Sequence, residues 1–341
     1  ARPVDDLFLK RCLELARLGG SAVGANPRVG AVLACDGRII GEGYHACYGQ
    51  AHAEVRAITS VRDAELLPRA SLYVTLEPCR HHGKTPPCTD LIIASGIRRV
   101  VIGCLDPNPE MQGKGVAQLR AAGVDVLMAH NPEAFAALNP FFARNQQSKR
   151  PYILLKWAET ADGYIGCVSG ERLLISDAPA NHYVHYLRSQ YQAILIGKNT
   201  AYRDDPYLSV RHYYGRQPDR IVLDIDLILP ETLNIFRSEG TVVVINRLRD
   251  EVVGNRIYLV PRRKEAYLNL ALLLAELYER LHIGSVLVEG GRYLLQQFIT
   301  QKLYDEIQVI RSPRTQQGAD IAAPVLPYNF KFDEVSPIGG D

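Results

Sequence analysis

The sequence lacks the segments that mark a secreted or membrane protein. Its first residues, 1–8, carry acidic groups and no long apolar run, so we expect no signal peptide. The most apolar segment, 268–281, is interrupted by Glu276 and Glu279 and is too short to span a bilayer. The formal charge of the 341 residues is only +2, which provides no net field to attract nucleic acid or a membrane surface. We therefore expect a cytoplasmic protein.

Cysteine is sparse, and its seven copies are odd in number and scattered along a long chain. A disulfide framework would need a denser set in a smaller, secreted domain. Four cysteines lie among apolar residues and are predicted to be reduced core residues: Cys12, Cys35, Cys104 and Cys167. The neighbours of Cys79 and Cys88 are more specialised.

Two nucleotide-binding motifs are also missing. No complete G-x-G-x-x-G follows a predicted strand, and no G-x-x-x-x-G-K-[ST] occurs, so neither a typical dinucleotide fingerprint nor an ATP loop is supported. No internal repeat or low-complexity block is present.

Length and patterning indicate two α/β domains. A chain of 341 residues is long for one core, and strands alternate with helices throughout it. The polar run 145–150, which precedes Pro151, is the predicted linker between domains 1–145 and 151–341. Predicted strands cover 29–35, 39–44, 71–75, 99–102, 124–128, 152–157, 193–197, 220–224, 241–245 and 285–289. Predicted helices cover 5–18, 52–60, 88–95, 115–122 and 293–299, and a further helix carries Tyr183 to Tyr191 with Ser176 as its N-cap.

The strongest chemical signal is a histidine, a glutamate and two cysteines in the first domain. His52-Ala53-Glu54 is followed by Cys79 after a Glu-Pro pair and by Cys88 after two prolines. One imidazole and two thiolates provide three zinc ligands and leave the fourth tetrahedral position open for water. Zinc acidifies such a water, and Glu54 is placed to move its proton to the ring nitrogen and the leaving amine. The pattern predicts a deaminase site in which Glu54 is catalytic and His52, Cys79 and Cys88 bind the metal.

This prediction sets conditions on the fold. His52 and Glu54 are two residues apart and converge only where a helix begins. Cys79 is expected at a similar junction after the strand 71–75, beside His52 at one edge of the sheet. A structural zinc site closed by His81 or His82 is the alternative, and it would leave Glu54 without a role.

Eight residues separate Cys79 from Cys88, whereas the general deaminase pattern has two between its cysteines. The intervening loop 80–87 contains histidines, a lysine and stiffening prolines. Its donors are suited to a phosphate group on the substrate.

The second domain is less informative. Glu289-Gly290-Gly291 ends a predicted strand and opens a predicted helix, where backbone N–H groups can hold a pyrophosphate. Two glycines are equally typical of a plain tight turn. Arg188 adjoins the apolar face of its helix, where an arginine commonly extends to solvent.

His52-Ala53-Glu54 and the whole stretch 75–88 closely resemble the bacterial bifunctional riboflavin-biosynthesis deaminase/reductase family. So do the segments 26–30 and 106–109, and the eight-residue cysteine spacing is the most specific feature. In the second domain, the segments around Lys156, Asp162, Arg188, Thr200, Asp204, Arg211 and Glu289 resemble the family's reductase domain, which is similar to dihydrofolate reductase. The resemblance implies an α/β protein, with a cytidine-deaminase-like three-layer domain followed by a dihydrofolate-reductase-like α/β domain.

The resemblance also implies two reactions of riboflavin biosynthesis. The first is zinc-dependent hydrolytic deamination of 2,5-diamino-6-(5-phosphoribosylamino)pyrimidin-4-one. The second is NADPH-dependent reduction of the ribosyl group of the uracil product to ribityl. The implied cofactors are therefore Zn²⁺ and NADPH. The expected partners are a small-molecule phosphoribosyl-pyrimidine and further copies of the chain in a homo-oligomer, without nucleic acid or a membrane.

Site residues follow from the resemblance by position in this sequence. The implied substrate contacts are Asn26, Arg172, Arg188, Leu208, Arg211 and Glu289. The implied NADPH contacts are Ala158, Leu174, Thr200, Asp204 and Gly291.

Two alternatives stay open on the sequence. Arg172 stands where the family commonly has a serine, and Leu174 where a tryptophan is expected, so one alternative is a deaminase with an inactive reductase domain. The other is a nucleic-acid-editing zinc deaminase with an appended binding domain. The near-neutral charge and the long cysteine loop weigh against that second alternative.

Overall fold

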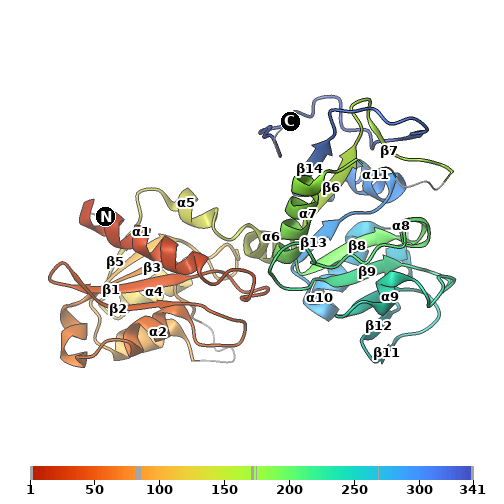
Figure 1. Ribbon diagram of the computed structural model, residues 1–341. Coiled ribbons are helices and arrows are strands. Elements are labelled where there is room, and N and C mark those ends of the chain that lie inside the picture. The colour runs from red at the N-terminus through yellow and green to blue at the C-terminus, as the bar shows by residue number, and fades with distance from the viewer. Residues whose placement is uncertain (1–2, 81–85, 170–172, 174, 268, 339–341) are drawn as a thin grey trace. The chain divides into compact units, whose positions relative to one another are not determined.

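A computed structural model of the chain describes all residues except 1–2, 81–85, 170–172, 174, 268 and 339–341. It divides into two compact units, Ala1–Lys149 and Arg150–Asp341 (Figure 1). None of the helices in the described parts is long and apolar enough to cross a bilayer.

The run 145–150, the predicted linker between the two domains, is mostly helical. Helix α6 (Pro140–Ser148) continues into it and ends at Lys149, whose backbone is left-handed with φ 52°. The run contains no glycine or proline before Pro151, so nothing in it interrupts the helical hydrogen bonds, and the amide of Lys149 still donates to the carbonyl of Asn145. The division between the two compact units falls after Lys149, inside this run.

The first unit is built on a five-stranded sheet with the order β2-β1-β3-β4-β5. Its strands are β1 (Gly30–Cys35), β2 (Arg38–Tyr44), β3 (Ser71–Leu76), β4 (Arg99–Cys104) and β5 (Asp125–Met128). The first three pair antiparallel, and β4 and β5 continue the sheet parallel to β3. Asp36 and Gly37 connect β1 to β2 with φ of 51° and 76°, the positive values that a tight hairpin turn requires.

Helices cover both faces of this sheet and make three layers (Figure 1). Helix α1 (Pro3–Arg17) packs on β1 and β3, and α5 (Pro132–Ala136) packs on β4 and β3. On the opposite face, α2 (Ala53–Thr59) lies against β2 and β1, while α3 (Cys88–Ala94) packs between α2 and α4 (Lys114–Ala121). A short 3-10 helix, η1 (Ala64–Arg69), precedes β3.

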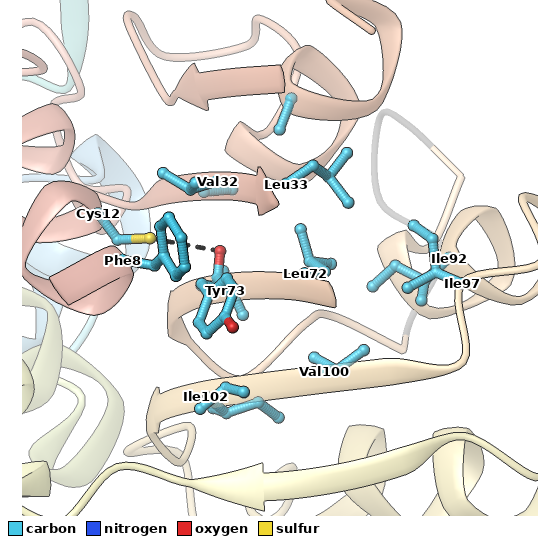
Figure 2. Packing of buried hydrophobic residues seen from close by; sticks show 14 of the residues in the cluster. Phe8, Cys12, Val32, Leu33, Leu72, Tyr73, Ile92, Ile97, Val100 and Ile102 are labelled. Atoms are coloured by element: carbon cyan, nitrogen blue, oxygen red, sulfur yellow. Dashed lines mark hydrogen bonds between the residues drawn. The ribbon is translucent and has the colours of Figure 1, made fainter. Parts of the chain in front are cut away.

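The apolar core of the first unit lies between these layers. Figure 2 shows Phe8 and Cys12 of α1 close to Tyr73, with Ile92 and Ile97 at the other end of the cluster. The rings of Phe8 and Tyr73 are 5.0 Å apart between centroids, and the thiol of Cys12 donates to the Tyr73 carbonyl oxygen at 3.4 Å. Cys12 is therefore a reduced core residue, as predicted, and Cys35, Cys104 and Cys167 are likewise buried and form no disulfide.

The second unit contains an eight-stranded sheet with the order β11-β12-β10-β9-β8-β13-β6-β14. Its strands are β6 (Tyr152–Glu159), β8 (Ala193–Gly197), β9 (Asp219–Leu223), β10 (Val242–Ile245), β11 (Glu251–Val253), β12 (Arg256–Leu259), β13 (Ser285–Val288) and β14 (Glu306–Arg311). Strand β11 pairs antiparallel with β12, and the other neighbouring pairs are parallel. Parallel strands present their carboxyl ends at one edge of the sheet, where ligands of open α/β folds bind.

Helices α10 (Leu270–Leu281) and α11 (Arg292–Thr300) pack their leucines against one face of this sheet. Helix α7 (Ala178–Gln190) packs against the other face, next to Ala158 and Ile310. The expected N-cap of α7, Ser176, was wrong by one residue: the carboxylate of Asp177 accepts the hydrogen bond of the Ala180 amide at 2.9 Å. The remaining elements are α8 (Lys198–Asp204), α9 (Asn234–Arg237), η2 (Lys264–Tyr267) and the two-stranded sheet of β7 (Tyr164–Gly166) and β15 (Ile321–Ala322).

Candidate active sites

His52 and Glu54 lie where helix α2 begins. His52 is the N-cap residue with extended backbone, φ −67° and ψ 162°, and Glu54 lies in the first turn. The histidine has not yet entered the helical repeat, so its side chain can approach a residue two positions later. The predicted helix start is therefore present, and Glu54 is buried with 4% of its surface exposed.

The two cysteines approach His52 from a second junction. Cys79 follows the carboxyl end of β3, and Cys88 is the first residue of α3. The Nδ1 atom of His52 lies 3.3 Å from the Cys88 sulfur and 3.6 Å from the Cys79 sulfur, and all three ligand atoms lie within 4.8 Å of one another. Two ligands of one tetrahedral zinc, at zinc distances of about 2.1 and 2.3 Å, lie about 3.6 Å apart. The three side chains thus fit a single zinc ion.

Electrostatics in this cluster favour a cation. A hydrogen bond from the Cys88 thiol, together with His52, lowers the pKa of Cys79, so that Cys79 loses its proton more readily than Cys88. That shared hydrogen bond and burial raise the pKa of Cys88, and a bound dication would displace the shared proton. Burial, and then the negative charge of Cys79, raise the pKa of Glu54 to about 7, which suits a group that both accepts and returns a proton.

Asn26 contacts His45, a residue next to His52 that the sequence did not indicate as part of the site. The side-chain amide of Asn26 lies 3.1 Å from Nε2 of His45, whose Nδ1 lies 3.3 Å from the carbonyl oxygen of Ala51. The ring of His45 stands edge-on to the ring of His52, with 5.7 Å between centroids. His45 immediately follows β2, and its position at a strand end beside the predicted site was the signal that could have found it.

Glu77, two residues before Cys79, was also missed as a site residue. Its buried carboxylate accepts backbone hydrogen bonds at 2.8 to 3.1 Å from four amides: Asp106, Gly113, Gly115 and Val116. Its own amide donates to the carbonyl of Cys104 at the end of β4. These bonds fix the chain next to Cys79 to the following loop and to the start of α4.

His81 and His82, the alternative fourth ligands, lie outside the described residues, as does most of the loop 80–87.

In the second unit the structure brings Arg188 and Glu289 together. Arg188, on α7, donates from Nη2 and Nε to the two carboxylate oxygens of Glu289 at 2.7 and 3.2 Å, and from Nη1 to the carbonyl of Ser209 at 3.2 Å. Burial alone would raise the pKa of Glu289. The positive charges of Arg188 and Lys156 outweigh burial and hold this pKa below its usual range. Burial lowers the pKa of Lys156, against the attraction of Glu289. The expected surface placement of Arg188 was wrong: only 12% of its side chain is exposed.

Leu208 and Arg211 lie on the loop that Arg188 contacts. Leu208 is buried and has φ 55°, an uncommon conformation for a branched residue. Arg211 is exposed, and its guanidinium carbon lies 5.0 Å from the centroid of the Tyr207 ring. A strained backbone at a loop of this kind is a common property of binding sites.

The expected NADPH contacts lie at neighbouring strand and helix ends. Gly291 is the N-cap residue of α11, and its amide donates to the hydroxyl of Thr200 on α8 at 2.8 Å. Asp204 is the last residue of α8, and Ala158 lies near the carboxyl end of β6. Arg172 and Leu174 lie outside the described residues.

Known proteins match both units. Residues 3–104 match the cytidine and deoxycytidylate deaminase zinc-binding region, and residues 151–321 match the RibD C-terminal domain. The riboflavin biosynthesis protein RibD of Aquifex aeolicus is 39% identical over 321 residues, which cover 92% of this chain and 88% of that protein. The Escherichia coli protein is 35% identical over 99% of this chain and 97% of its own length.

Solved structures agree. RibD of Acinetobacter baumannii matches with a TM-score of 0.81 and 32% identity over 97% of this chain and 92% of that one. The Thermotoga maritima diaminohydroxyphosphoribosylaminopyrimidine deaminase/5-amino-6-(5-phosphoribosylamino)uracil reductase matches with a TM-score of 0.79 and 38% identity over 98% and 93% of the two chains. The chain belongs to the RibD family.

As a RibD-family protein, the chain is a bifunctional enzyme of riboflavin biosynthesis, a deaminase followed by a reductase. The deaminase domain binds zinc, and the reductase domain depends on NADPH. The predicted fold class and the two predicted activities are confirmed. The comparisons do not favour a nucleic-acid-editing deaminase or a RibD protein without reductase activity.

Proposed function

We propose that the first unit removes the 2-amino group of 2,5-diamino-6-(5-phosphoribosylamino)pyrimidin-4-one and that the second unit reduces the ribosyl group of the resulting uracil to ribityl. The observation that carries the first step is the convergence of the His52, Cys79 and Cys88 ligand atoms beside buried Glu54. The similar Thermotoga maritima protein is a deaminase of a diaminohydroxyphosphoribosylaminopyrimidine and a reductase of the phosphoribosylaminouracil, which supports the same pair of reactions.

Three side chains would hold the zinc: His52 through Nδ1, and Cys79 and Cys88 through sulfur. When bound, zinc supplies the Lewis acidity that makes water a nucleophile at neutral pH. Glu54 accepts the proton of the attacking water and returns protons to the pyrimidine nitrogen and to the departing amine, which leaves as ammonia. Asn26 and His45 form the hydrogen-bonded wall next to this cluster, and Asn26 holds the pyrimidine.

In the reductase we assign different tasks to the two arginines. The guanidinium of Arg188 already donates to Glu289 and to the carbonyl of Ser209. Arg188 therefore fixes the position of these two groups. Arg211 is exposed over Tyr207, and its guanidinium is suited to pair with two oxygens of the substrate phosphate. Leu208, Glu289 and Arg172 complete the substrate contacts.

When bound, NADPH would supply the hydride for reduction at C1′ of the opened ribose. The amide of Gly291 and the hydroxyl of Thr200 lie at the start of α11, where a helix terminus favours a pyrophosphate. Asp204, Ala158 and Leu174 are assigned to the rest of the cofactor.

Two finer expectations stay predictions: a cytoplasmic location and a homo-oligomeric state. Sedimentation velocity of the full chain measures the second of these directly.

The decisive experiment supplies the diaminopyrimidine phosphoriboside to the zinc-loaded full chain. Ammonia should be released without NADPH, and NADPH should be oxidised only as deaminated product accumulates. No ammonia release from zinc-loaded protein would contradict the first assignment, and no NADPH oxidation with the deaminated product would contradict the second.

A further inference from the structure

The loop that carries Arg211 is held in place by side chains rather than by a sheet or a helix. Arg188 donates to the carbonyl of Ser209 at 3.2 Å. The side-chain amide of Gln217 accepts from the amide of Val210 and donates to its carbonyl, both at 2.8 Å. Backbone groups held this way have a fixed direction before any ligand arrives, which reduces the entropy lost on binding.

His185 provides the clamp at Arg211 itself. It is buried on α7, with 5% of its surface exposed. Its Nδ1 atom accepts the hydrogen bond of the Arg211 amide at 2.8 Å and lies 3.4 Å from the His212 amide. An Nδ1 that accepts two amides carries no proton, so the ring is neutral with its proton on Nε2.

The charges around His185 keep it in that form. Burial, and then the positive charges of Arg188 and Arg211, lower the pKa of His185 to about 4, against the attraction of Glu289. Nδ1 of His185 therefore remains a hydrogen-bond acceptor across the pH range in which enzymes usually work.

Aromatic rings dock the same loop on α7. The His212 ring stands edge-on to His185 with 4.7 Å between centroids. Tyr213 packs in the same manner against His182 and Tyr186, with centroids 5.5 and 5.2 Å away. The loop thus follows the helix over two turns, and His185 is the residue there that hydrogen-bonds its backbone at Arg211.

We propose that His185 is a positioning residue of the reductase. Its Nδ1 atom fixes the backbone of Arg211 and thereby keeps the guanidinium over Tyr207, where it binds the phosphate of the substrate. The inference rests on the proposed role of Arg211. It adds a residue that touches neither substrate nor cofactor and acts through the binding of the substrate.

Steady-state kinetics of the full chain with 5-amino-6-(5-phosphoribosylamino)uracil and NADPH test this. His185→Leu removes the acceptor at nearly constant volume, and it should raise KM for the uracil about five- to tenfold while kcat stays within about twofold, because one backbone hydrogen bond is lost. His185→Asn places Oδ1 where Nδ1 was and should restore most of the affinity. Asn181→Leu, at an exposed position of the same helix, is the control and should leave KM unchanged.

Two further readouts separate positioning from loss of structure. NADPH binding, measured by isothermal titration calorimetry, should be unchanged in His185→Leu. Ammonia release from the diaminopyrimidine should be unchanged too, because the zinc ligands belong to the other compact unit. If His185→Leu does not fold, His185→Ala removes the same acceptor without adding bulk.

A double-mutant cycle distinguishes the failure of this inference from that of the proposed function. Arg211→Ala should raise KM, and adding His185→Leu should raise it little further, because both changes act on one contact. An unchanged KM in Arg211→Ala would overturn the assigned role of Arg211. A raised KM in Arg211→Ala with an unchanged KM in His185→Leu, or equal damage by the Leu and Asn variants, would overturn the positioning role alone.

Discussion

Gly43 lies directly under the backbone of Ala53. A Cβ atom at Gly43 would come within 2.5 Å of the carbonyl oxygen of Ala53 and of the amide nitrogen of Ala57, closer than van der Waals contact permits. The absence of a side chain on β2 therefore lets α2 approach the sheet, and the start of α2 carries His52 and Glu54.

The Gly43→Ala variant should push α2 away from the sheet. Overpacking of this kind costs about 1–3 kcal/mol, and the displacement of His52 should lower zinc occupancy as well. Thermal unfolding and metal content of the purified protein measure the two effects. Gly197→Ala is the control, because a Cβ there meets only Leu294, at 4.0 Å. Equal zinc content and stability in the two variants would show that the close approach is unimportant.

The metal assignment predicts about one zinc per chain. Cys88→Ala should lose most of the bound zinc because only two protein ligands remain. Cys35→Ala removes a buried thiol that lies outside the cluster and should keep the metal. Elemental analysis checks both, and full zinc occupancy in Cys88→Ala would exclude Cys88 as a ligand.

Glu54→Gln should retain zinc and lose ammonia release by several orders of magnitude. The substitution keeps the size of the side chain and removes only its capacity to move protons. Metal content and ammonia release are measured on the same preparation. Normal turnover by the zinc-loaded variant would contradict the proton transfer assigned to Glu54.

Removal of Arg188 should abolish reduction and spare deamination. In Arg188→Ala the buried carboxylate of Glu289 keeps Lys156 but loses its hydrogen-bonded partner, a change that costs several kcal/mol for such pairs. Ammonia release should stay near the wild-type rate, and 5-amino-6-(5-phosphoribosylamino)uracil should accumulate until unmodified protein and NADPH are added. Loss of deamination in a folded, zinc-loaded Arg188→Ala protein would show that the two activities are not independent.

The buried His185 predicts how stability depends on pH. In the unfolded chain a histidine binds a proton near its ordinary pKa of 6.5, whereas burial and Arg188 lower the pKa to about 4 in the folded protein. Between these pH values the unfolded state binds more protons than the folded state. The contribution of His185 to the free energy of unfolding is therefore complete above pH 6.5 and is lost as the pH falls toward 4. Urea unfolding followed by Trp157 fluorescence should show a smaller loss from pH 7 to pH 5 in His185→Asn than in wild type. An equal loss in both would argue against the low pKa.

Local sequence was sufficient to single out His52, Cys79 and Cys88, whose ligand atoms the structure brings together, because each residue belongs to a short motif. The spacing in His52-Ala53-Glu54 required a helix start, and that is where α2 begins. Cys79 lies three residues after β3, a strand that its own β-rich residues specify. By contrast, the sequence did not indicate that the helical hydrogen bonds of α6 continue into the polar residues of the predicted linker.

The sequence by itself indicated the α/β class, the group of His52, Cys79 and Cys88 with Glu54 and, by resemblance, the two activities, because these depend on residue chemistry at short spacing. The tertiary structure alone decided which distant groups meet. It placed Glu77 across four backbone amides, paired Arg188 with Glu289 over 101 positions of sequence, and set His185 against the Arg211 amide. No local pattern encodes such pairs, since a buried charge or an acceptor selects its partner only when packing has excluded water and brought the strand ends together.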